Sequence, residues 1–176
     1  MEEENHEQEL MDWLHETRAV FPKLDDLVIF CDYKEMNAKS LGYVRGKVSH
    51  MHDFNAEALL LGEEMTIRKK IVKPPEYEIF INSKLRKIRN PLLRKQIVHT
   101  IIIHELYHIE QDDLITISKE YGRRKKKKIH THNFLEEVFD RYNQLRENKG
   151  IPKISNIKHL EEAIHKILDS IGWHGK

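Results

Sequence analysis

The sequence predicts an α+β fold in which a small, mostly antiparallel sheet packs on one buried helix, with additional helices at the N- and C-terminal ends. Three observations lead to this prediction. The run NPLLRKQIVHTIIIHELYHIEQ, residues 90–111, is apolar nearly all round, which is typical of a helix inside a core. Short stretches rich in β-branched and aromatic residues precede it. Stretches with helical periodicity lie at both ends of the chain.

The bulk composition favours a single polar globule. A length of 176 residues suits one domain over 1–176, with a helical extension over about 151–176. No apolar run approaches the roughly 20 residues that span a bilayer, and the acidic start MEEENHEQEL is no secretory signal, so no membrane partner is expected. Cys31 is the single cysteine, which excludes a disulfide framework and favours a cytoplasmic location.

The first half of the chain predicts one helix followed by strands. Residues 7–20 carry apolar residues at helical spacing, and Pro22 marks the stop. The stretch LVIFCDY, 27–33, reads as a strand, and 41–51, with two glycines, fits a second strand containing a turn or bulge. Periodicity leaves 56–73 open between a short helix and another strand.

A further strand is expected over 77–83, just before the buried helix. Tyr77, Ile79 and Ile81 alternate with Glu78, Phe80 and Asn82, so the strand has two different faces. It is either an edge strand, whose free backbone groups can pair with an extended peptide, or an ordinary interior strand. The sequence leaves both alternatives open.

The buried helix carries the motif HExxH. Asn90 is a good N-cap with Pro91 at the first helical position. His104 and His108 are four residues apart, so both imidazoles can reach a single ion on one helix face. Glu105 lies about 100° round from His104, close enough to address a water on that ion. This pattern is the zincin arrangement, which predicts one Zn²⁺ per chain.

The position of the motif inside an apolar helix strengthens this interpretation. Burying a charge or an unpaired imidazole costs several kcal/mol unless something binds it. A metal ion would supply that binding. The alternative is that His104, Glu105 and His108 lie on a solvent-facing strip and coordinate nothing.

A basic run follows the motif and leads into two more expected helices. Its six consecutive cations repel one another and favour a solvated loop: Arg123, Arg124, Lys125, Lys126, Lys127 and Lys128. This loop is either a soluble connector or a contact to nucleic-acid phosphates. Asn133 and Glu136 resemble a capping box, which predicts a helix from near Phe134 to Gly150. A C-terminal amphipathic helix is expected over 157–171.

A catalytic zinc ion usually has three protein ligands, so the motif needs a third from elsewhere. The short form HExxHxxGxxH is absent, since Gln111 and Leu114 stand where its glycine and last histidine would be. The candidates are the histidines and acids that follow: His130, His132, Glu136 and Glu137. We favour His130, because Phe134 four residues later can bury itself and fix the imidazole.

The segments IIIHELYHI and HTHNF resemble the SprT-like metallopeptidases and related phage and archaeal metallopeptidases over roughly residues 27–145. The resemblance implies a zincin-like fold, the zinc ligands His104, His108 and His130, and Glu105 as the general base. It also implies a protein or peptide substrate and, for some relatives, work on DNA-bound proteins. Two features depart from the family: Thr131 follows His130 where the family often has glycine, and no cysteine-bearing zinc ribbon follows.

The function predicted is zinc-dependent hydrolysis of peptide bonds, with Glu105 accepting a proton from the attacking water. Four residues could provide a second donor to the oxyanion: Tyr107, His99, Arg141 and Tyr142. Two other functions stay open. In one, His132 fills a fourth position and zinc only closes the fold. In the other, the basic run Arg123–Lys128 serves a nucleic-acid-binding module.

Overall fold

The computed structural model describes residues 2–37, 40–54, 67–71, 73, 75–112, 114 and 132–173, with the backbone alone for 2–5, 50–54, 67–71 and 132. Several predictions therefore fall outside the described residues. They concern His130, the basic run Arg123–Lys128, the side chain of His132 and residues 56–66 of the open stretch 56–73, in which 67–71 forms a strand.

The elements follow one another in the order helix, strands, helices, and the α+β class is confirmed. The helices in the described ranges are α1 (Glu2–Arg18), α3 (Pro91–Glu110), α5 (His132–Asn148) and α6 (Ile157–Ser170). The strands are β1 (Val28–Lys34), β2 (Gly42–Lys47), β3 (His50–Phe54), β4 (Ile67–Ile71) and β5 (Glu76–Asn82). Two short 3-10 helices are η1 (Pro22–Leu24) and η2 (Ser83–Lys87).

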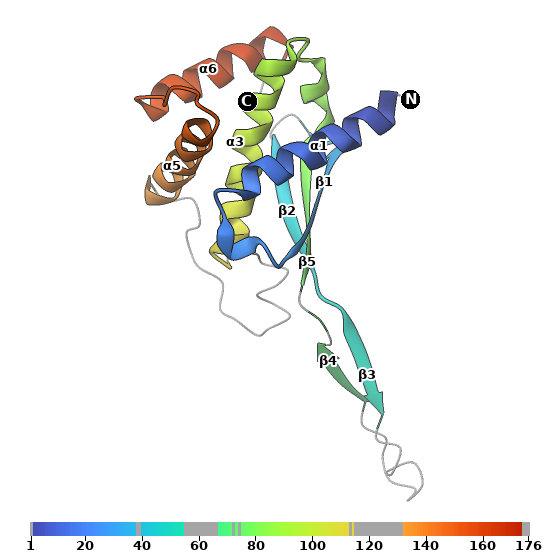
Figure 1. Ribbon diagram of the computed structural model, residues 1–176. Helices are drawn as coiled ribbons and strands as arrows, with labels where there is room; N and C mark the ends of the chain where they lie inside the picture. The colour runs from blue at the N-terminus through green and yellow to red at the C-terminus, as the bar shows by residue number, and fades with distance from the viewer. Residues whose placement is uncertain are drawn as a thin grey trace, which may run out of the picture.

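The sheet is mixed, with the strand order β1-β5-β2. Within it β2 pairs antiparallel with β5, and β1 pairs parallel with β5, so this sheet is mixed and not mostly antiparallel as predicted. β3 and β4 pair antiparallel in a separate two-stranded sheet. After β1 the chain passes to the far edge as β2 and returns through the β3–β4 ribbon, so β5 enters between β1 and β2. Figure 1 shows this ribbon projecting beyond the body of the molecule.

One face of the sheet supplies part of the core, and the predicted period of two is confirmed. Alternate residues of β1 and β5 are buried: Ile29, Cys31, Tyr33, Tyr77, Ile79 and Ile81. β5 is the central strand, so of the two alternatives the interior one is correct. β2, in the described part of the chain, is an edge strand.

The helix α3 packs between the sheet and the later helices, and Figure 1 shows α5 and α6 on the side of α3 away from the sheet. Its predicted N-cap is confirmed, because Asn90 Oδ1 accepts hydrogen bonds from the backbone N–H groups of Leu92 (3.0 Å) and Leu93 (3.2 Å). β2 approaches α3 closely at Gly42. A Cβ atom there would lie 2.5 Å from Ile101 Cγ2, so this crossing needs glycine.

Some boundaries differ from those predicted. The stretch 41–51 forms parts of two strands, β2 and β3, because the chain leaves the sheet at 48–49 and enters the ribbon. α5 begins at His132, so Asn133 lies in its first turn and is not its N-cap. The N-cap of α6 is Asn156, whose side chain accepts from the N–H of Lys158 at 2.9 Å.

Candidate metal and active site

His104 and His108 lie one turn apart on α3 with their rings turned toward the same point. The two Nε2 atoms are 3.2 Å apart. Two nitrogens that each bind zinc at 2.0–2.1 Å with tetrahedral angles lie about 3.3 Å apart. The pair therefore has the spacing that a shared zinc ion requires.

The motif is largely withdrawn from solvent. Glu105 is 6% exposed and His108 is 7% exposed, while His104 is half-buried. This burial disfavours the alternative of a solvent-facing strip. It also means that the three polar side chains occupy a region where an unsatisfied polar group is costly.

Phe134, in the first turn of α5, packs against both imidazoles. Its ring centroid lies 5.1 Å from that of His104 and 4.6 Å from that of His108. It is also 4.8 Å from the ring of Tyr107. Phe134 is buried, as expected, and its described ring contacts are with His104, Tyr107 and His108 of α3. The start of α5 is thus held directly beside the pair.

The described residues contain no group of three or more metal-ligating side chains that could hold an ion. Glu136 and Glu137 are exposed and line a separate hollow with Asn133, Asp140 and Asn156. The acids of α5 are therefore not brought to the histidine pair. The two histidine candidates for the third ligand, His130 and the side chain of His132, lie outside the described residues.

Glu105 also faces the sheet. Burial raises the pKa of the Cys31 thiol on β1, and the nearby carboxylates of Asp32 and Glu105 raise it further. Cys31 therefore stays protonated at neutral pH and is not prepared to act as a thiolate ligand.

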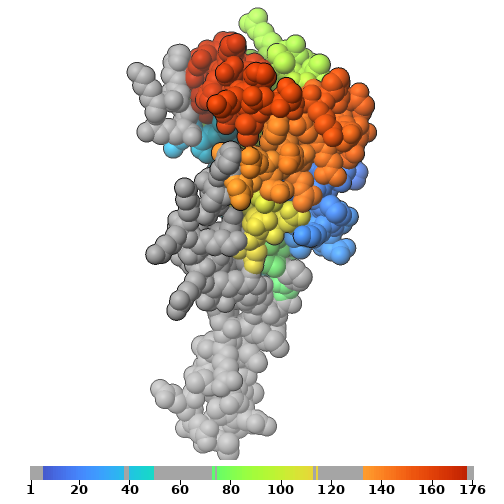
Figure 2. Space-filling view, turned by 90° about the vertical axis from the view of Figure 1, so that its left-hand side faces the viewer, coloured from blue at the N-terminus to red at the C-terminus, as the bar shows by residue number. Residues whose placement is uncertain are grey.

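A cavity of about 430 Å³ opens beside the motif. It lies between α3, α5, α6 and the start of β2, and His104 and Glu105 form part of its wall. Figure 2 shows α5 in orange and α6 in red covering this side of the molecule. The lining is mostly apolar, and polar groups come from the two motif residues and from Ser40, Thr100, Glu161 and His165.

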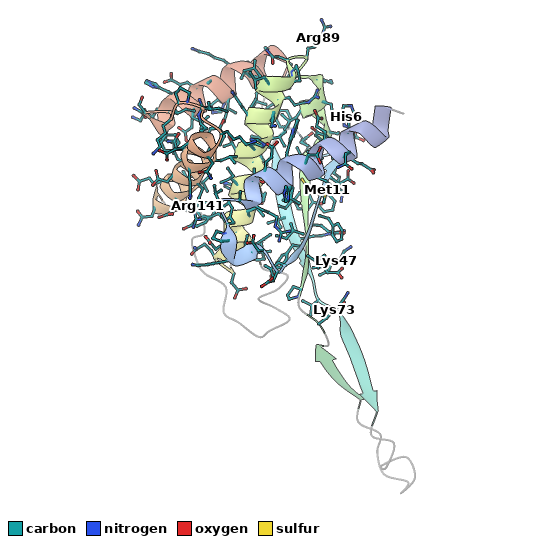
Figure 3. The ribbon with its side chains drawn as sticks, viewed as in Figure 1. His6, Met11, Lys47, Lys73, Arg89 and Arg141 are labelled. Carbon is teal, nitrogen blue, oxygen red and sulfur yellow. The ribbon has the colours of Figure 1, made fainter. Side chains whose placement is uncertain are left out.

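The four residues predicted as oxyanion donors do not line this cavity. His99 is buried against Trp13, and Tyr142 is buried in the core. Arg141 donates to the Val20 carbonyl and pairs with Glu110 at 3.2 Å, and Figure 3 shows it between α5 and the end of α1. Tyr107 packs on Phe134.

Two residues of α6 that the sequence did not single out do line the cavity, Glu161 and His165. The helical periodicity of α6 could have indicated these two residues. Each follows an apolar residue of the packing stripe, Leu160 and Ile164. They therefore lie at the border of the face that α6 turns toward α3.

No family model matches this chain, and neither the curated proteins nor the solved structures contain a significant match. Of the helices that the structure describes, none is both long and apolar enough to cross a bilayer.

Proposed function

We propose that this chain is a cytoplasmic zinc-dependent metallopeptidase with a zincin-like fold, related to the SprT-like metallopeptidases. One observation carries the proposal. The Nε2 atoms of His104 and His108 lie 3.2 Å apart on a buried helix, and the intervening Glu105 shares a cavity wall with His104. This combination fits a divalent ion held next to a carboxylate and to a space for a substrate.

The proposed ligands are His104, His108 and one of two further histidines: His130, which precedes α5, or His132, the first residue of α5. Phe134 supports this choice, because its contacts hold the first turn of α5 against the pair. His132 stands two residues before Phe134. His130, which we favour, stands four residues before it, within about 14 Å of extended chain. A catalytic zinc site would use only one of these two histidines and would leave the fourth coordination position open for water or substrate.

The chemistry assigned to the chain's own residues is proton transfer. When bound, zinc supplies Lewis acidity for a substrate carbonyl and for a water molecule, whose pKa falls towards about 7. The Glu105 carboxylate accepts the proton of that water and passes it to the amine that leaves when the peptide bond breaks. The buried helix α3 keeps the carboxylate at a fixed angle to the two imidazoles.

The proposed substrate is a protein or peptide in extended form. β2 is an edge strand of the described sheet, and its first residue, Gly42, lines the cavity beside His104 together with Ser40 and Leu41 just before it. An extended peptide that pairs with an edge strand gains main-chain hydrogen bonds independent of its sequence. At this edge the peptide would pass directly over the motif.

The test separates metal binding from catalysis. Glu105→Gln should keep zinc and abolish cleavage of a denatured protein pool, because it keeps the size of the side chain and loses the base. His104→Ala should lose the metal. Zinc per chain is measured by elemental analysis, with His159→Ala, an exposed position on α6, as the matched control. Full peptidase activity in the Gln variant would remove Glu105 from its role.

The first alternative is a structural zinc ion that stabilises the fold without catalysis, with His132 as the fourth ligand. X-ray absorption of the zinc-loaded protein discriminates between a structural and a catalytic site. Four protein ligands and no water favour a structural site, and three ligands with water favour the enzyme.

A nucleic-acid-binding function is favoured by a second feature besides the basic run Arg123–Lys128. Three consecutive cations, Arg68, Lys69 and Lys70, stand on β4 of the ribbon that projects from the body (Figure 1). A two-stranded ribbon has the width of a DNA major groove. If the protein does not bind duplex DNA at low salt, this function is ruled out.

A further inference from the structure

We infer that the cavity beside His104 and Glu105 is a side-chain pocket that selects peptides with a bulky aliphatic or aromatic residue next to the cleaved bond. This inference rests on the proposed function for the position of the bond. The pocket itself follows from the residues that form it.

The walls of the cavity come from three helices and are mostly apolar. Ile97 and Ile101 contribute from α3, Val138 from α5, and Leu160 and Ile164 from α6. The polar lining residues are fewer: Ser40, Thr100, His104, Glu105, Glu161 and His165. A lysine, glutamate or amide side chain placed against the aliphatic part of the wall would lose hydration there. A leucine, methionine or phenylalanine side chain would instead leave water for an apolar surrounding.

The size of the cavity fits such an occupant. Its volume of about 430 Å³ lies in the lower part of the range of about 300–1,000 Å³ that is usual for ligand sites. This space takes one large side chain with part of its backbone. It is too small for a helix or strand of a folded partner.

The position of the cavity argues for a peptide rather than a free apolar molecule. Gly42, the first residue of the edge strand β2, lines the cavity together with Ser40 and Leu41 just before it. His104 and Glu105 line the same cavity. A peptide that pairs with β2 therefore carries one side chain over the opening while its backbone passes the motif.

Gly42 brings the start of β2 close to α3. A Cβ atom at Gly42 would lie 2.5 Å from Ile101 Cγ2 and 3.0 Å from the carbonyl oxygen of Phe80. The glycine thus sets the distance between the strand that would hold the backbone and the helix that would hold the side chain.

Methyl NMR of the full-length protein, with and without zinc, tests the pocket independently of cleavage. The probes are N-acetyl-leucinamide and N-acetyl-phenylalaninamide, compared with N-acetyl-alaninamide and N-acetyl-lysinamide. The leucine and phenylalanine amides should shift the methyl signals of Ile101 and Ile164. They should bind about 10-fold or more tightly than the alanine amide. The signal of Ile29, which lies on β1 outside the cavity, should not move.

A variant pair locates the binding. Ile164→Trp narrows the cavity from α6 and should weaken binding of the leucine amide at least about 10-fold. Leu92→Trp adds the same indole at a position that is 60% exposed on the first turn of α3, and should change nothing. A thermal melt of each variant shows whether it is folded.

Cleavage then reports on the position of the pocket relative to the bond. In a peptide series that differs at one residue, kcat/KM should be about 10-fold higher for leucine or phenylalanine than for alanine, and Ile164→Trp should shift the preference toward alanine. Equal binding of all four amides, or shifts at Ile29 alone, would overturn the pocket. Selective binding without cleavage of any peptide would leave the pocket standing and overturn the peptidase.

Discussion

The three histidines of α3 have two different roles, because their burial and their neighbours differ. His104 and His108 face each other, whereas His99, 5% exposed, lies edge-on to Trp13 with Nε2 3.1 Å from Glu16 Oε2. Burial lowers the pKa of His99 to about 4, although Glu16 opposes the shift. His99 is therefore neutral in the folded protein at pH 7, and its surroundings assign it to packing.

Acidification should destabilise the protein through His99. Its folded pKa of about 4 lies below the value of about 6.5 in the unfolded chain, so the unfolded state binds more protons between these limits. The free energy of unfolding should fall by on the order of 2 kcal/mol as the pH drops from about 6.5 to about 4. Urea unfolding at several pH values measures this decrease in the free energy of unfolding.

His99→Gln should show a smaller loss over the same pH range, because glutamine does not titrate. His159→Gln, on the exposed side of α6, should behave like the wild type. The comparison is made with a chelator present, so that metal release adds no pH dependence. Parallel pH profiles for the wild type and His99→Gln would contradict this explanation.

At the scale of elements, the crossing of β2 over α3 brings the start of β2 to the candidate site. Three hydrogen bonds from Asn82 hold the chain that leads into β2. The fully buried Asn82 at the end of β5 donates through Nδ2 to the carbonyls of Asn37 (3.1 Å) and Ser40 (2.8 Å). The backbone N–H of Asn82 also donates to the Leu41 carbonyl at 2.9 Å.

Gly42→Ala should destabilise the fold by about 1–3 kcal/mol, because its Cβ overlaps Ile101 Cγ2. Ile101→Leu moves the branch away from that position and should recover part of the loss in the double variant. A double-mutant cycle from urea unfolding measures the coupling. Strictly additive effects of the two substitutions would show that this contact does not set the strand position.

Asn82→Ala should cost about 1–3 kcal/mol of stability, since it removes a fully buried amide that donates two hydrogen bonds to the chain leading into β2. It should also reduce cleavage, because Ser40 borders the cavity. Asn90→Ala removes an exposed helix cap instead and should cost about 1 kcal/mol without lowering kcat/KM. Equal losses in the two variants would contradict the role given to Asn82.

At the scale of the whole molecule, contacts between distant segments hold the helical layers together. Glu16 of α1 bonds to Lys95 of α3 at 2.8 Å and also pairs with Lys149 after α5. Arg141 of α5 joins Glu110 of α3 to the turn after α1. A zinc ion shared between α3 and a histidine at or before the start of α5 would add one more link of this kind.

Zinc should therefore raise the thermal stability of the whole chain. At 100 times its dissociation constant, a ligand of the folded state adds about 2.7 kcal/mol, which raises Tm by about 5–10 °C for a protein of this size. His104→Ala should abolish the rise, and the loss of it in His130→Ala or His132→Ala identifies the third ligand. An unchanged Tm at saturating zinc in the wild type would contradict a shared site.

The sequence by itself determined what depends on local periodicity. The helical repeat placed His104 and His108 on one face, the alternation of Tyr77, Ile79 and Ile81 gave the buried side of β5, and Asn90 marked the start of α3. Tertiary structure decided the strand order, the parallel pair β1–β5 and the cavity that α6 closes over His104. These depend on hydrogen bonds and packing between segments far apart in the chain, which no local pattern encodes.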